Sequence, residues 1–141
     1  MRSRNKMLTL LFVLMAMAIA LTGCSSNKLA SGFDEQTVKQ AAKSVIEKMN
    51  SGSFESITND MVRDDLKTAL SASVLSGAAS QILAGAGTFE SYASEATVGA
   101  KDKKTGDDFA TVIIVAQYAN KKVTYTISFD TQMKVIGLFM K

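Results

Sequence analysis

The chain has 141 residues, 47% of them hydrophobic, with one cysteine and no histidine, tryptophan or proline. Three of its 16 basic residues lie in the first 23 positions and all 13 acidic residues follow, so the net charge of +3 belongs to the N-terminal segment and the remainder is neutral. The lack of histidine excludes Ser–His and Cys–His catalytic pairs, and interleaved, balanced charges do not form the basic surface that nucleic acids require.

The N-terminal segment predicts export and lipid attachment. Basic residues within the first six positions precede an apolar run at 7–21, which is shorter than the ~20 residues of a bilayer span and is typical of an export signal. The following sequence LTGC resembles the bacterial lipobox, whose cysteine thiol receives a diacylglyceryl group before the signal is cut on its N-terminal side. This resemblance predicts a signal peptide at 1–23, cleavage between Gly23 and Cys24, and a lipid on Cys24 that anchors the protein at the extracytoplasmic face of the cell membrane. An uncleaved signal anchor with an incidental cysteine is the alternative.

The mature chain predicts a short tether and one domain. Residues 24–33 are mainly small and polar and are expected to form a flexible, lipidated tether. Residues 34–141 suit a single domain with one core. Within it, a helix is expected over 33–50, capped by Asp34, because apolar residues recur at alternating steps of three and one.

Three further helical pieces are expected before the sheet. A short one carries Phe54 and Ile57, a second covers 59–70 with Asp60 as its cap, and a third covers 71–87 and stops at its terminal glycines. The last of these presents small residues on one face, which favours close packing against neighbouring backbone rather than phosphate binding.

After Gly87 the spacing of apolar residues changes from the helical period of 3.6 residues to the strand period of 2 residues. Strands are expected at 89–101, 109–119, 122–129 and 134–140, and their short links predict an antiparallel meander. The strand at 109–119 is apolar on both faces, which indicates burial of both. Either the sheet is strongly curved, or a second copy of the chain covers its outer face in a homodimer.

Helices followed by a four-stranded meander predict an α+β fold with N-terminal helices on a curved antiparallel sheet. This pattern resembles the nuclear transport factor 2-like (cystatin-like) cone superfamily. The sequences VIEKMNSGSFESI, GTFESY and FDTQMKVIGLFM are similar, more closely, to a family of bacterial envelope domains, domain of unknown function family 3887. The resemblance covers about 36–140 and departs at Ser53, where the family usually has aspartate. It implies a fold and an envelope location but no catalytic activity.

A cone fold implies a cavity between helices and sheet, which is the default place for a small apolar ligand. Its expected lining consists of three tyrosines, Tyr92, Tyr118 and Tyr125, with Met49, Phe54 and Met61 as walls. Plain core packing of the same side chains is the alternative, because apolar stripes at these periods are mainly core.

Catalysis is not predicted, although a cone-fold enzyme would use a buried carboxylate or tyrosine as its acid or base. Glu90 and Glu95 are the carboxylates inside an expected strand, and at most one of Asp64 and Asp65 could point inward from a helix. The aspartates of the loop at 101–108 are expected in solvent. A calcium-loop pattern is absent, so neither a metal nor a cofactor is predicted. A non-catalytic domain that binds a ligand or a protein is favoured over an assembly subunit or a small enzyme.

Overall fold

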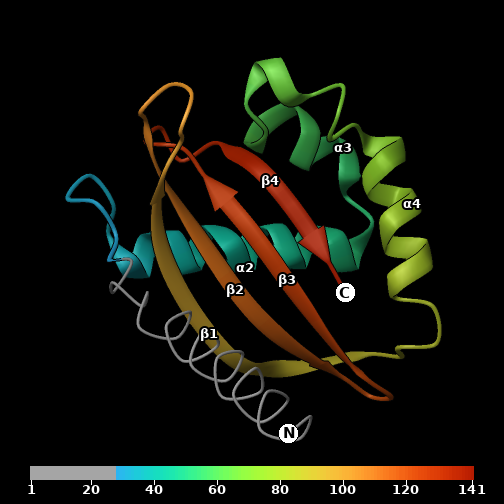
Figure 1. Ribbon diagram of the computed structural model, residues 1–141. Coiled ribbons are helices and arrows are strands. Elements are labelled where there is room, and N and C mark those ends of the chain that lie inside the picture. Colours follow the sequence, from blue (N-terminus) through green and yellow to red (C-terminus); the bar gives the residue numbers. More distant parts are fainter. Residues whose placement is uncertain (1–27) are drawn as a thin grey trace, which may run out of the picture.

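The structure, a computed structural model, describes residues 28–141 and places helices against one face of a four-stranded antiparallel sheet (Figure 1). This confirms the expected α+β class with its curved meander. The signal peptide, the cleavage position and lipid attachment at Cys24 lie outside the described residues and stay predictions. None of the helices formed by residues 28–141 is long and apolar enough to cross a bilayer.

The helix α2, Glu35–Ser51, lies across the inner face of the sheet (Figure 1). Its predicted cap is confirmed, since the Asp34 carboxylate accepts a hydrogen bond from the Thr37 N–H at 2.8 Å. The helix ends at Gly52, whose φ of 74° is the left-handed conformation that glycine adopts without strain. The buried residues of α2 are Val38, Ala42, Val45, Ile46 and Met49.

The segment after α2 is less regular than its sequence suggests. A short helical turn, α3 at Phe54–Ser56, continues into a π-helical turn at Ile57–Met61 and a 3₁₀ turn at Asp64–Leu66. The α-helix expected over 59–70 is therefore wrong. Val62 is extended and forms a parallel bridge with Val135, so sheet pairing overrides the local helical pattern.

The helix α4, Ala72–Ile82, packs against α2 and α3. Ser71 caps it, and the chain leaves it through Gly85 and Gly87, both with positive φ, as the sequence predicts.

The sheet has the order β1–β2–β3–β4, formed by Phe89–Lys101, Asp108–Tyr118, Lys122–Phe129 and Val135–Met140. Two irregularities in the pairing of β1 with β2 interrupt its register near Ser91 and Ser94. Such bulges increase local twist and bend a strand, and in Figure 1 the sheet curves around α2.

The core lies between the inner face of the sheet and α2. Alternate residues of β2 and β3 point inward and are buried, whereas their neighbours on the outer face are only half-buried. The double burial predicted for β2 is therefore not seen within the described chain. The buried strand residues are Ala110, Val112, Ile114, Ala116 and Tyr118 in β2, and Val123, Tyr125, Ile127 and Phe129 in β3.

The start of the described chain is packed onto the domain. Leu29 and Ala30 lie against the core, Phe33 is buried, and the backbone of Lys28 and Leu29 crosses β1 directly over Gly99. Only glycine leaves space for this crossing. The tether expected over 24–33 is thus seated on the sheet from Lys28 onward.

Candidate functional site

Two of the predicted cavity residues form a buried hydroxyl pair beneath the end of α2. The hydroxyl oxygens of Tyr118 and Tyr125 are 2.7 Å apart, and Tyr118 donates to Oδ1 of Asn50 at 2.6 Å. Burial raises the pKa of both tyrosines above the ordinary value of 10, so both hydroxyls are neutral at physiological pH. Their geometry joins α2 to two strands.

The interior around this pair is filled. Tyr125 is 0% exposed, while Tyr118 and Met49 are each 2% exposed. A water-sized void beside any of them would leave part of its surface accessible, so these three residues pack in the core and do not line a cavity. Core packing, the alternative interpretation of the sequence, therefore accounts for these three residues.

The other three predicted residues are near the surface. Met61 packs against the margin of the core, and Phe54 borders an open surface pocket beside α4. Tyr92 is half-buried, with its ring 5.0 Å from the ring of Phe89 and 5.1 Å from Nζ of Lys43. The structure does not bring the six residues together around one site.

The carboxylates considered for catalysis are also separated. Glu95 pairs with Lys43 at 2.7 Å at the side of the domain, and Glu90 is exposed. Asp64 and Asp65 are exposed and paired with Lys67 and Arg63, respectively. Among residues 28–141, no group of three or more acidic or sulfur ligands is placed to hold a metal ion.

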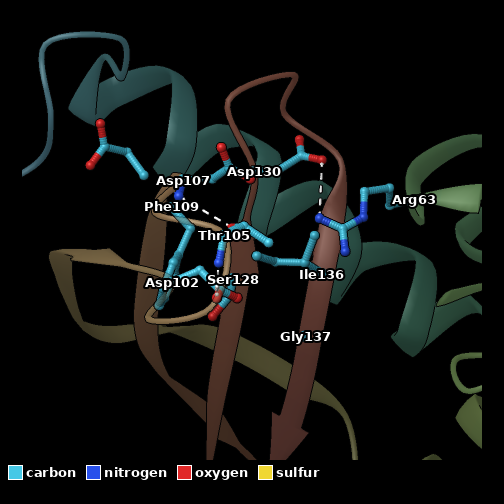
Figure 2. A pocket seen from close by; sticks show the side chains of 10 residues that line it. Arg63, Asp102, Thr105, Asp107, Phe109, Ser128, Asp130, Ile136 and Gly137 are labelled. Carbon is cyan, nitrogen blue, oxygen red and sulfur yellow. Dashed lines mark hydrogen bonds and ion pairs between the residues drawn. The ribbon is translucent and has the colours of Figure 1, made fainter. Parts of the chain in front are cut away.

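A polar pocket of about 270 Å³ lies on the outer side of the sheet, between the β1–β2 and β3–β4 hairpins (Figure 2). Phe109, Ser128 and Gly137 belong to its floor, and Arg63 stands at one side. The remaining lining residues are Asp102, Thr105, Asp107, Asp108, Asp130 and Ile136.

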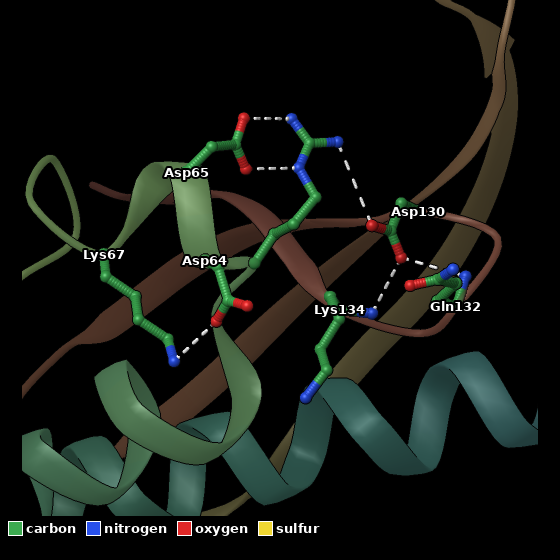
Figure 3. Close-up of polar contacts among 7 residues, drawn as sticks. Asp64, Asp65, Lys67, Asp130, Gln132 and Lys134 are labelled. Atoms are coloured by element: carbon green, nitrogen blue, oxygen red, sulfur yellow. Dashed lines mark hydrogen bonds and ion pairs between the residues drawn. The ribbon is translucent and has the colours of Figure 1, made fainter.

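Most of the charged side chains of this pocket take part in local hydrogen bonds or ion pairs. Asp102 accepts hydrogen bonds from two backbone N–H groups of its own hairpin, which hold its pKa below the usual range. Asp130 accepts hydrogen bonds from two backbone N–H groups of the β3–β4 hairpin and approaches Arg63 at 3.9 Å, while Arg63 forms two hydrogen bonds with Asp65 at 2.7 and 3.0 Å (Figure 3). The hydrogen-bonded Asp65 carboxylate raises the pKa of Arg63. These interactions stabilise the loops, and no two of the carboxylates in them are arranged as an acid–base pair.

Beyond this pocket the outer face of the sheet carries no charge. Cross-strand pairing places uncharged side chains next to one another, and Thr111 and Ser128 share a hydrogen bond of 2.8 Å. Charged residues appear only at the far end, at Lys122 and Lys141. The uncharged residues are Ser94, Ala96, Val98 and Ala100 in β1, Phe109, Thr111, Ile113 and Val115 in β2, Thr124, Thr126 and Ser128 in β3, and Gly137 and Phe139 in β4.

An apolar groove of about 200 Å³ runs between β4 and α4. Val74 of α4 and Phe139 of β4 line it and are 49% and 61% exposed, the two exposed large apolar residues of the described chain. Sequence reasoning missed this groove. Its signal was the absence of any charged residue from 68 to 89, a run of 22 positions.

Residues 42–138 match the family described as "Protein of unknown function (DUF3887)". The chain belongs to this family. A similar solved structure is the NMR structure of a protein from Ruminococcus gnavus ATCC 29149, with 26% identity and a TM-score of 0.71, covering 81% of this chain and 96% of that chain. No curated protein matches the chain.

The family and the α+β fold expected from sequence are thereby confirmed. The likeness to the nuclear transport factor 2-like superfamily and the lipid anchor stay predictions.

Proposed function

We propose that this DUF3887 protein is a lipid-anchored, extracytoplasmic module that binds a protein partner through the outer face of its sheet and performs no catalysis. The observation that carries this proposal is the contrast between a filled interior and an outer sheet face whose centre carries no charge. Among residues 28–141, Tyr125 and its buried neighbours pack the space between α2 and the sheet. Depletion of charge is the mark of the centre of a protein–protein interface.

The anchoring part of the proposal rests on the lipobox-like sequence before Cys24 and gains support from the position of Lys28. Cys24 precedes Lys28 by four residues, which span at most about 14 Å. Because Lys28 lies over Gly99 on β1, a lipid on Cys24 would hold the β1 side of the sheet close to the membrane. The outer face would then stand beside the membrane surface, open to a neighbouring protein.

A second copy of the chain is the second candidate partner, and the charge distribution favours it. The outer face has aspartates at its hairpin end, around the pocket of Asp102 and Asp130, and lysines at the other end, Lys122 and Lys141. Two copies packed face to face with antiparallel strands would bring each acidic end over the basic end of the other. Such a contact is self-complementary, as a two-fold interface requires.

Site-specific photo-crosslinking in intact cells tests the outer face. A benzophenone amino acid at Ile113 probes the face, and the same amino acid at Gln40, on the exposed side of α2, is the matched control. We expect a crosslinked product from Ile113 and none from Gln40. A product of twice the chain mass identifies the homodimer, and another mass identifies a different partner. Equal crosslinking at both positions, or none at Ile113, contradicts the proposal.

Fractionation tests the anchor separately. Cys24→Ser removes the thiol that would carry the lipid, and we expect the protein to leave the membrane fraction. A membrane-bound Cys24→Ser protein would instead support the uncleaved signal anchor.

A further inference from the structure

The sheet ends at β4, and only the beginning of its outer edge is paired. Val62 forms a parallel bridge with Val135, and the Arg63 N–H donates to the Val135 carbonyl at 3.1 Å. The chain then turns away into the 3₁₀ turn at Asp64–Leu66. A fifth strand therefore starts beside β4 and stops after one bridge.

The rest of this edge presents backbone groups without a partner in the described chain. Lys141 exchanges both of its backbone hydrogen bonds with Thr124, at 2.8 and 3.0 Å. In an antiparallel ladder the bonded residues alternate, so the N–H and C=O groups of Leu138 and Met140 point away from β3. No backbone group of residues 28–141 outside the sheet bonds to them. Such an edge is a template for pairing with another strand.

The apolar groove lies along this same part of β4. Leu138, Phe139 and Met140 line one side, and residues of α4 line the other. Its volume of about 200 Å³ exceeds that of an apolar cavity of about 150 Å³ that accommodates benzene. The groove has room for one or two large apolar side chains.

The charges around the groove indicate which kind of segment could bind there. No charged residue lines the groove, and β4 is bracketed by Lys134 and Lys141. Lys134 donates to the backbone carbonyl of Asp60 at 2.9 Å and, among residues 28–141, forms no direct ion pair, although the Asp64 carboxylate lies near enough for the positive charge of Lys134 to lower its pKa. An apolar strand with acidic residues at its ends complements this arrangement.

We propose that the free edge of β4 binds an extended apolar strand of a protein partner, flanked by Asp or Glu. The strand pairs with the backbone of Leu138 and Met140 and places alternate side chains between β4 and α4, while its other side chains face solvent. This inference rests on the proposed role as an anchored binding module, but it uses the edge of β4, which meets the outer face at Phe139. The β4 edge lies across the sheet from β1 and Lys28, on the side away from the proposed anchor.

Peptide selection on the full-length protein in detergent micelles tests the edge directly. The probe is a phage-displayed library of random ten-residue peptides. We expect enriched peptides to alternate apolar residues over five or six positions and to carry Asp or Glu at their ends. Val74→Glu places a charge in the groove from an exposed position and should weaken the best peptide about tenfold or more. Gln40→Glu, at an exposed position on α2 outside both proposed binding surfaces, is the matched control and should leave affinity within about twofold.

N-methylation of the selected peptide distinguishes strand pairing from simple burial. Only every second N–H of an added strand faces β4, so methyl groups on one alternate set should abolish binding and those on the other set should not. The proposal is overturned if no peptide is enriched, if Val74→Glu leaves affinity unchanged, or if both methylated sets bind alike. It is also overturned if the protein instead dimerises in a way that Val74→Glu disrupts, because a second copy then occupies the edge. The outer-face crosslinks at Ile113 are scored independently, so either proposal can fail alone.

Discussion

The two faces of one sheet differ more than any two other regions of the molecule. On β2, Ile114 points inward and is fully buried, whereas its neighbour Ile113 points outward and is half-buried. Both faces are uncharged along much of β2 and β3, yet only the inner face is covered within the described chain. The comparison teaches that apolar alternation alone does not separate a face covered by the chain's own core from a face that stays accessible.

Polar groups sharpen the same contrast. On the inner face the hydroxyls of Tyr118 and Tyr125 bond to each other and to Asn50, so the interior is closed. On the outer face Thr111 and Ser128 pair across strands but stay accessible. We infer that the inner face determines stability and that the outer face is available for recognition.

The largest expected effect comes from truncating the same residue type on each face. Ile114→Ala leaves a cavity under α2 and should lower the free energy of unfolding by about 3 kcal/mol, within the range for buried isoleucines. Ile113→Ala should cost well under half as much, because its side chain stays partly solvated. Urea denaturation of both variants measures the difference. Equal losses would mean that something covers the outer face in solution, as a homodimer does.

Two glycines provide the next comparison. A Cβ on Gly99 would stand 2.7 Å from the carbonyl carbon of Lys28 and 2.9 Å from Cα of Leu29. Gly99→Ala should therefore push the N-terminal segment off β1, at about 1–3 kcal/mol, and expose the Phe33 N–H to hydrogen exchange. Gly137→Ala is the control on the outer face, where the nearest atom is Cβ of Ser128 at an ordinary 3.7 Å. Unchanged exchange at Phe33 would contradict the seating of this segment.

Tyr125→Phe tests the buried hydroxyl pair and should cost about 1 kcal/mol, the net value of one hydrogen bond, since Tyr118 keeps Asn50. Burial raises the pKa of Tyr125 in the folded state, while the unfolded chain ionises near pH 10. Its contribution is therefore complete below pH 10 and is lost as pH rises above it. Urea denaturation from pH 8 to 11 should show a shallower alkaline decline for Tyr125→Phe. An unchanged decline would mean that a group other than Tyr125 causes the loss of stability at alkaline pH.

Much of the fold was predictable because its patterns are local. The Asp34 cap, the period of three and one in α2, and the alternation of β3 each identify an element without reference to its neighbours. The segment 59–70 was not predictable, because Val62 is extended through pairing with Val135, more than 70 residues later. The packing of residues 28–33 was not predictable for the same reason, since the contact of Lys28 and Leu29 with Gly99 joins distant parts of the chain.

The candidate site was predicted less well than the fold. The sequence identified buried tyrosines but could not show that Tyr118 and Tyr125 bond to each other and fill the space that a cone cavity would occupy. The groove beside β4 depends on how α4 sits beside an edge strand, and a single sequence carries no information on that spacing. Its one visible trace is the uncharged run from 68 to 89.

The smallest expected effect concerns the surface at acidic pH. Hydrogen bonds from Thr37 hold the pKa of the exposed Asp34 carboxyl below its ordinary value of 3.8. A lowered pKa in the folded state gives a contribution that is present above pH 4 and is lost as pH falls through the folded value. Asn also caps helices and does not titrate in this range, so Asp34→Asn should flatten the acid side of the stability profile slightly and leave the alkaline side unchanged. Urea denaturation from pH 2.5 to 7 measures the first part and the series used for Tyr125→Phe measures the second. If Asp34→Asn alters the alkaline side instead, surface and interior are coupled, and the separation between the two faces of the sheet is less complete than their packing implies.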